Sequence, residues 1–169
     1  MDLPLYNPTK EDKEFPEAAK TFKQALVEAD GMFITGPEYN GFISPLLLNA
    51  ITWATRGEGN MYAGFKGKIV GLMGTSPGAM GGMRMLRSFA TFLSDMGATV
   101  VPGHNAVGRS HQVMKDGKVV DERTQSKIDA ACGQLVHFAR YEVNRERDCK
   151  VYEEYLNQTT MGEYGAVDN

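Results

Sequence analysis

Apolar residues recur along the chain in two patterns, one with the spacing of a helix and one typical of a buried strand. The first pattern predicts helices, and the second predicts short strands between them that are bounded by glycine and proline. In chain order the predicted elements are helix 16–29, strand 32–35, helix 44–57, strand 68–73, helix 83–96, strand 99–101 and helix 122–147. This alternation predicts an α/β fold with a parallel sheet covered by helices on both faces.

The segments outside this alternation carry weaker signals. Residues 1–13 are polar and contain proline, so we expect them to be irregular. Pro102 is expected to end the third strand, and Asp116-Gly117 indicates the tight turn of a small hairpin or extended excursion. The polar stretch 150–169 is expected to be a tail with a frayed end or a partner contact. We therefore predict one domain over 1–149, followed by this tail.

Two glycine-rich loops follow the first two predicted strands, over residues 36–41 and 75–82. Because the carboxyl ends of parallel strands share one edge of a sheet, both loops should lie on that edge, where such folds bind ligands. Small residues let the backbone approach a flat ligand, and successive amides can donate to its carbonyls and ring nitrogens. The alternative is that both loops merely connect strands to helices.

These loops also resemble a known family. The run 37–41, Pro-Glu-Tyr-Asn-Gly, followed by Asn49-Ala50-Ile51 and Trp53, resembles the signature of the NADPH-dependent FMN reductases. Ser76-Pro77-Gly78, Gly81-Gly82 and Arg84 resemble the second flavin loop of that family. The resemblance covers residues 3–139. It implies a flavodoxin-like three-layer sandwich, FMN as the cofactor and NADPH or NADH as the electron donor.

The resemblance also implies an activity, which is hydride transfer from NAD(P)H through the flavin to a small acceptor such as a quinone or another flavin. Since the flavin carries this chemistry, we predict no catalytic side chain, and the three histidines show no metal-ligand spacing. Two roles are predicted for Glu38, which could cap loop amides or act as a base. For Arg84, contact with nucleotide phosphates is weighed against simple solvation. The predicted cofactor-binding residues are Pro37, Glu38, Tyr39, Asn40, Gly41, Thr75, Ser76, Pro77, Gly78, Gly81, Gly82 and Arg84.

The sequence departs from the family pattern at its beginning. Such proteins normally start with a strand, a loop that wraps the FMN phosphate, a helix and a second strand, which are expected to be missing here. Losing about three hydrogen bonds to a charged group, at roughly 1.5–3 kcal/mol each, would weaken FMN binding by roughly 10³-fold or more. We therefore expect an N-terminally truncated fold with an exposed edge on strand 32–35. The alternative function is a non-catalytic or weakly flavin-binding interaction subunit.

Composition narrows the remaining choices. The 169 residues are 42% hydrophobic with a net charge of −3, which excludes the basic surface of a nucleic-acid-binding protein. No apolar run is long enough for a membrane span, and no signal peptide is evident, so a cytoplasmic protein is expected. Cys132 is expected to pack on the last helix and Cys149 to be exposed. The resemblance further implies a homodimer or homotetramer.

Overall fold

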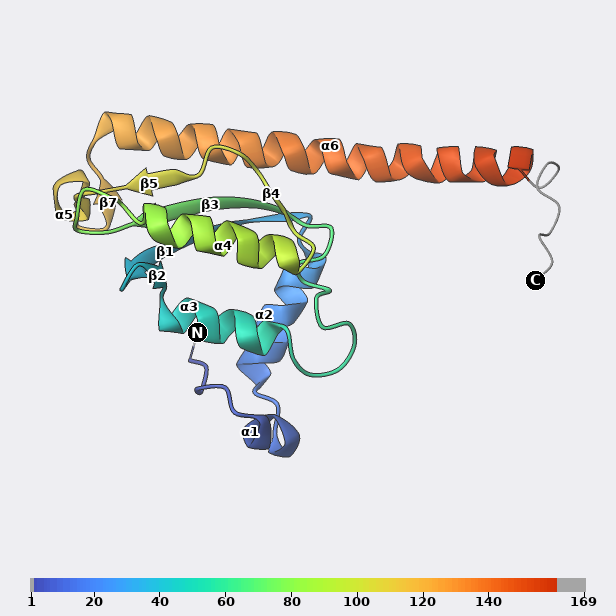
Figure 1. The fold of residues 1–169 in the computed structure, drawn as a ribbon, viewed down its shortest axis with the longest axis horizontal. Helices are drawn as coiled ribbons and strands as arrows, with labels where there is room; N and C mark the ends of the chain where they lie inside the picture. Colours follow the sequence, from blue (N-terminus) through green and yellow to red (C-terminus); the bar gives the residue numbers. More distant parts are fainter. Residues whose placement is uncertain (1, 161–169) are drawn as a thin grey trace.

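A sheet of mostly parallel strands forms the centre of the computed structural model, which describes residues 2–160 apart from the side chains of 12–13, 146–148 and 152–160. Helices precede and follow its strands, as Figure 1 shows. In chain order the elements are α1 (Pro8–Lys13), α2 (Glu17–Glu28), β1 (Gly31–Tyr39), β2 (Phe42–Ile43), α3 (Pro45–Ala54), β3 (Ile69–Thr75), α4 (Met83–Asp95), β4 (Thr99–Val100), β5 (Asn105–Val107), α5 (Ser110–Val113), β6 (Met114–Lys115), β7 (Lys118–Val119) and α6 (Glu122–Thr160).

Strand β3 lies in the middle of the sheet. It pairs in parallel with β1, from Gly31 opposite Ile69 to Pro37 opposite Thr75. On its other side it pairs in parallel with β4 and then with β5. Strand β2 folds back antiparallel on the last two residues of β1, so the remaining outer edge of β1 pairs with no strand among the described residues. The predicted α/β fold and the exposed edge are both confirmed.

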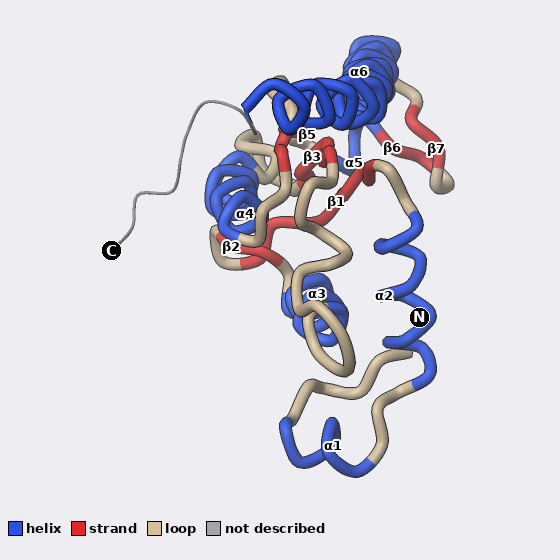
Figure 2. The backbone as a smooth tube through the Cα atoms, turned by 90° about the vertical axis from the view of Figure 1, so that its right-hand side faces the viewer, coloured by secondary structure: helices blue, strands red, loops and turns tan. Residues whose placement is uncertain are grey.

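Helices cover the two faces of this sheet unequally. Helix α6 lies along one face, whereas α4, α3 and α2 lie on the other, as the two views of Figures 1 and 2 show. The main core packs around β3, which is buried over nearly its whole length because both of its faces are covered. Its fully buried side chains include Ile51, Phe65, Val70, Leu72, Met85, Phe89 and Leu93. The sheet and its helices thus form the three predicted layers.

The N-terminal segment is held by two residues of α3. The Trp53 side chain is fully buried, and its Nε1 donates to the Pro4 carbonyl at 2.7 Å. The Asn49 amide donates to the same carbonyl at 3.0 Å and accepts the Tyr6 N–H at 2.8 Å. The Asn7 side chain caps α1. Residues 1–13, which we expected to be irregular, therefore include a short helix.

Two other predicted boundaries are wrong, and one strand of the sheet was not predicted. Strand β1 continues past Thr35 to Tyr39 because its end pairs with β2. The chain resumes the sheet as β5 after Pro102, since β3 offers further backbone partners there. Helix α6 extends beyond Arg147 to Thr160, and its last turns project past the sheet in Figure 1. The first part of the predicted tail is therefore helical, and residues 161–169 lie outside the described residues.

The expected placement of the two cysteines is also corrected. Cys132 is exposed and Cys149 is half-buried. Ala131, which precedes Cys132 on α6, is buried, so the Cys132 side chain points to a different side of the helix and reaches solvent. Among residues 2–160, no helix combines the length and apolarity that crossing a bilayer requires.

Candidate functional site

The first predicted loop forms a tight hairpin. Asn40 and Gly41 form its two-residue turn with positive φ angles of 54° and 78°, and Tyr39 pairs with Phe42 across it. This is the geometry that an Asn-Gly pair favours in a tight hairpin. The same dipeptide signal was present in the sequence, so the hairpin could have been predicted there. Pro37 to Gly41 therefore form a structured tip at the carboxyl end of β1.

The second loop, residues 75–82, is attached to the end of β5. The Ser76 N–H donates to the Val107 carbonyl at 3.3 Å, and the Ser110 N–H donates to the Ser76 carbonyl at 3.2 Å. The Arg109 N–H donates to the Gly78 carbonyl at 3.0 Å. Sequence reasoning missed this supporting segment, whose only local signal was a glycine after two apolar residues. The second loop is thus fixed by a third segment on the same edge.

The two predicted loops meet, as we expected. Pro37 and Thr75 are register partners on neighbouring strands. The Glu38 carboxylate accepts the backbone N–H groups of Arg84 and Met85, at 3.1 and 3.2 Å, where α4 begins. It also accepts Arg84 Nε at 2.9 Å and pairs with Arg84 Nη2. One carboxylate therefore connects the end of β1 with the helix that follows the second loop.

The environment of Glu38 decides between its two predicted roles. Its side chain is only 3% exposed. Burial raises the pKa of the carboxyl, but hydrogen bonds from the Met85 N–H and from Arg84 outweigh this effect and leave the pKa below its ordinary value. An ionised group held by several donors is a weak proton acceptor at neutral pH. The structure therefore favours amide capping over a role as base.

Arg84 is engaged although much of it faces solvent. Its side chain is 65% exposed, yet its charge is paired with Glu38. A Cβ atom at Gly41 would lie 3.6 Å from Arg84 Nε, so the guanidinium lies against the hairpin turn. The ion pair shows that Arg84 is not simply solvated, and the predicted contact with nucleotide phosphates stays a prediction. Arg84 joins the hairpin to α4.

The remaining predicted residues divide into a framework and an exposed surface. Gly81 and Gly82 are buried, and the Thr75 hydroxyl donates to the Val107 carbonyl at 3.0 Å. Gly41 and Ser76 are half-buried, whereas Pro37, Tyr39, Asn40, Pro77 and Gly78 are exposed. In the described part of the chain, the N–H groups of residues 78, 79 and 80 have no hydrogen-bond acceptor. Free amides beside exposed small residues fit the polar edge of a flat heterocycle.

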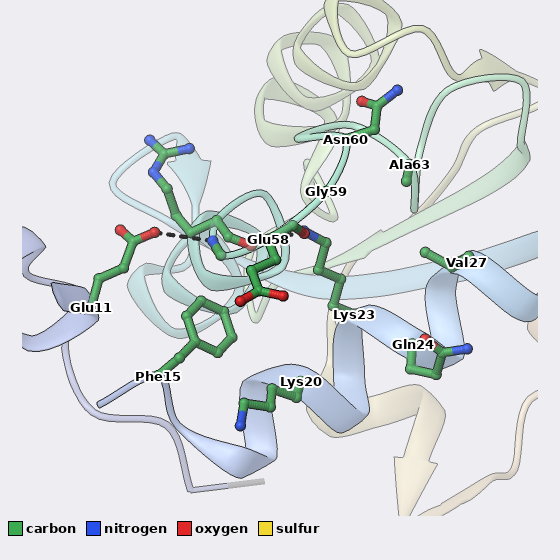
Figure 3. Close-up of a pocket in the computed structure, with 12 residues that line it drawn as sticks. Glu11, Phe15, Lys20, Lys23, Gln24, Val27, Glu58, Gly59, Asn60 and Ala63 are labelled. Atoms are coloured by element: carbon green, nitrogen blue, oxygen red, sulfur yellow. Dashed lines mark hydrogen bonds between the residues drawn. The ribbon is translucent and has the colours of Figure 1, made fainter. Parts of the chain in front are cut away.

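A separate cleft lies elsewhere. It has a volume of about 870 Å³ and lies between α1, α2 and residues 56–63, as Figure 3 shows. These segments lead into the amino ends of β1 and β3, opposite the two loops. Lys23 Nζ donates to the carbonyls of Arg56 and Glu58, and Arg56 Nε donates to the Tyr6 hydroxyl. None of the predicted site residues lines this cleft, and these two cations are already engaged.

A mostly parallel sheet whose carboxyl edge carries two joined loops defines a flavodoxin-like α/β protein. The sequence profile of the NADPH-dependent FMN reductases matches residues 1–112, so the chain belongs to this family. The family implies oxidoreductase activity with FMN as the cofactor and NAD(P)H as the electron donor.

Individual relatives agree with this assignment. A quinone reductase of Escherichia coli K12 is 31% identical over 144 residues, covering 83% of this chain and 73% of that protein. A 2-hydroxy-1,4-benzoquinone reductase of a Burkholderia species is 46% identical over 79 residues, covering 47% of this chain and 42% of that protein. The solved structure of FerB, a flavoenzyme NAD(P)H:(acceptor) oxidoreductase of Paracoccus denitrificans, aligns with a TM-score of 0.66 at 27% identity. The aligned part covers 85% of this chain and 76% of the FerB chain.

Proposed function

We propose that the chain binds the ring of FMN between the hairpin 37–41 and the loop 75–82, and transfers electrons from NAD(P)H to a quinone. The observation that supports this most directly is the joining of the two loops at one edge of the sheet through Glu38. The relatives named above are reductases or oxidoreductases, and two of them are named for quinones.

In this proposal the protein binds and orients, and bound FMN supplies the hydride chemistry. The free N–H groups of residues 78–80 donate to the polar edge of the ring. Exposed Tyr39 and Asn40 flank the ring from the hairpin. Glu38 and Arg84 keep the two sides together and do not touch the reacting atoms.

The surface around this edge favours a quinone over an anionic acceptor. Large apolar side chains that are 42–71% exposed lie on the hairpin, at the start of α3, in the second loop and at the start of α4. They are Tyr39, Phe42, Leu46, Met80 and Met83. Large apolar groups exposed on the elements of one sheet edge are candidates for a binding surface. The Arg84 charge, which would attract an oxyanion, is already paired with a carboxylate.

Flavin binding is tested by titrating the purified chain with FMN and following the quenching of flavin fluorescence. We expect saturable quenching, and an absorbance change on adding NADPH that reverses when benzoquinone is added. No quenching at high micromolar FMN would refute the proposal.

The acceptor site is tested by a pair of tyrosine variants. Tyr39→Ser should raise the KM for benzoquinone several-fold, because it removes apolar surface beside the ring. Tyr62→Ser should leave this KM unchanged, since Tyr62 is also exposed but lies before β3 at the opposite end of the sheet. Equal effects of the two substitutions would contradict the placement of the quinone.

The alternative of a non-catalytic interaction subunit is not favoured by the relatives. Association into a homodimer or homotetramer stays part of the proposal, with the open edge of β1 as a surface available for it. The division into a flavin domain over 1–149 and a C-terminal tail over 150–169 also stays a proposal. Light scattering of the purified chain would report the oligomeric state directly.

A further inference from the structure

One buried carboxylate joins two parts of the candidate site that are far apart in sequence. Glu38 lies near the end of β1, and its partners Arg84 and Met85 begin α4, 46 and 47 residues later. Besides the pairing of β1 with β3, these contacts of the Glu38 side chain connect the strand that carries the hairpin with the helix that follows the second loop. The hairpin tip itself, Asn40-Gly41, belongs to no ladder with β3.

The charge of Glu38 suits this position. The first N–H groups of a helix lack partners within the helix, and they carry a partial positive charge. The capping position of α4 is occupied by Gly82, which has no side chain to satisfy these N–H groups. Glu38 supplies the missing acceptor from another element, with one oxygen on the backbone N–H groups and the other on the Arg84 guanidinium.

Arg84 extends the connection from α4 back to the hairpin turn. Its guanidinium is held by Glu38 and lies against Gly41. The hairpin is thus restrained at two points, through the Glu38 side chain and through the packing of Arg84 on the turn. A loop restrained in this way keeps its geometry before a ligand arrives, which lowers the cost of ordering it on binding.

We propose that Glu38 is a positioning residue that holds the hairpin 37–41 at a fixed separation from the second loop and α4. The restraint is a property of the protein without ligand. Its effect on flavin affinity rests on the function proposed above. Glu38 does not contact the reacting atoms in this arrangement, so it sets how tightly the flavin binds and not how fast the bound flavin reacts.

The test combines hydrogen exchange of the flavin-free protein with flavin titration, using Glu38→Gln and Glu38→Ala. Glu58→Gln is the matched control, because Glu58 is exposed at the opposite end of the sheet. We expect faster exchange, by at least tenfold, both at the start of α4 and in residues 39–43 of the two Glu38 variants. We also expect at least tenfold weaker FMN binding, with an unchanged kcat once FMN saturates the protein. Glu38→Asp should not restore these properties fully, since its side chain is one methylene shorter.

The outcomes separate this inference from the proposed function. Faster exchange confined to α4, with unchanged exchange in the hairpin, would reduce Glu38 to a helix cap and overturn the inference. Unchanged flavin affinity in protein that does bind FMN would also overturn it. If the wild-type chain binds no FMN, the proposed function fails, while the exchange data still decide whether Glu38 restrains the hairpin.

Discussion

Substitution of Gly81 by alanine tests whether the second loop depends on its contact with the end of β5. Gly81 is buried and has a φ of +61°, in the left-handed region. An added Cβ would lie 2.4 Å from the Gly108 nitrogen and 2.6 Å from the Val107 carbonyl carbon. Both are backbone atoms, so no flexible side chain can rotate away to make room. The loop and the segment 107–110 must move apart.

The magnitude follows from two contributions. A non-glycine residue in the left-handed region costs roughly 1–2 kcal/mol. Forcing an extra carbon into a packed contact typically costs a further 1–3 kcal/mol. Gly81→Ala should therefore lower the free energy of unfolding by about 2–5 kcal/mol, which corresponds to a decrease in Tm of roughly 4–20 °C for a domain of this size. The hydrogen bond from Arg109 to the Gly78 carbonyl should weaken as well.

Gly78→Ala provides the matched control in the same loop. Gly78 is exposed, and the nearest atom to its added Cβ is the Ser76 hydroxyl oxygen at 4.0 Å. Its stability should change by no more than about 0.5 kcal/mol. If the Gly78 backbone approaches the flavin closely, this variant should nevertheless bind FMN more weakly. Thermal unfolding and FMN titration of both variants check these predictions. A shift of about 1 °C in Tm corresponds to no more than roughly 0.5 kcal/mol for a domain of this size. If the Tm of Gly81→Ala lies within about 1 °C of the wild-type Tm, the packing argument is refuted.

Three further predictions concern stability. Asn49→Ala should lower the free energy of unfolding by about 1–3 kcal/mol, because it removes the hydrogen bonds to Pro4 and Tyr6, and urea unfolding would measure this. The pKa of Glu38 in the folded protein lies below the ordinary 4.5, so its ionised form stabilises the fold above that pH. This stabilisation is lost as the pH falls through the lowered pKa. Glu38→Gln should therefore remove this loss of stability at acidic pH from a plot of unfolding free energy against pH. Phe89→Ala should lower the free energy of unfolding by about 3–5 kcal/mol in the same urea assay, since Phe89 is 1% exposed in the core.

Much of the fold could be predicted because its main elements have strong local signals. Helix α4 begins at the predicted Met83 and ends one residue before the predicted Met96, since its apolar face repeats regularly up to a glycine. Strand β5 could not be found in the same way. It is three residues long, follows Pro102-Gly103, and is defined by its pairing with β3. Short strands of this kind depend on a tertiary partner that no local pattern records.

The meeting of the two loops was predictable for a topological reason, while the contacts between them were not. Two loops that follow neighbouring parallel strands must share an edge, so their meeting required only the correct strand pattern. The direction of the Glu38 side chain depends on where α4 begins in space. The same holds for the support that residues 107–110 give to the second loop. These contacts join distant parts of the sequence, and only the assembled fold shows them.

The family signature itself divides into parts with different roles. Asn49 and Trp53 lie in α3 and bind the N-terminal segment through Pro4. The run 37–41 forms the hairpin, in which Glu38 faces α4 and Tyr39 faces solvent. The residues that carry the family resemblance therefore mostly have structural roles in the candidate site. If this division is correct, Asn49→Ala should reduce stability with little effect on FMN affinity, whereas Glu38→Gln should reduce FMN affinity at neutral pH even in preparations that remain fully folded.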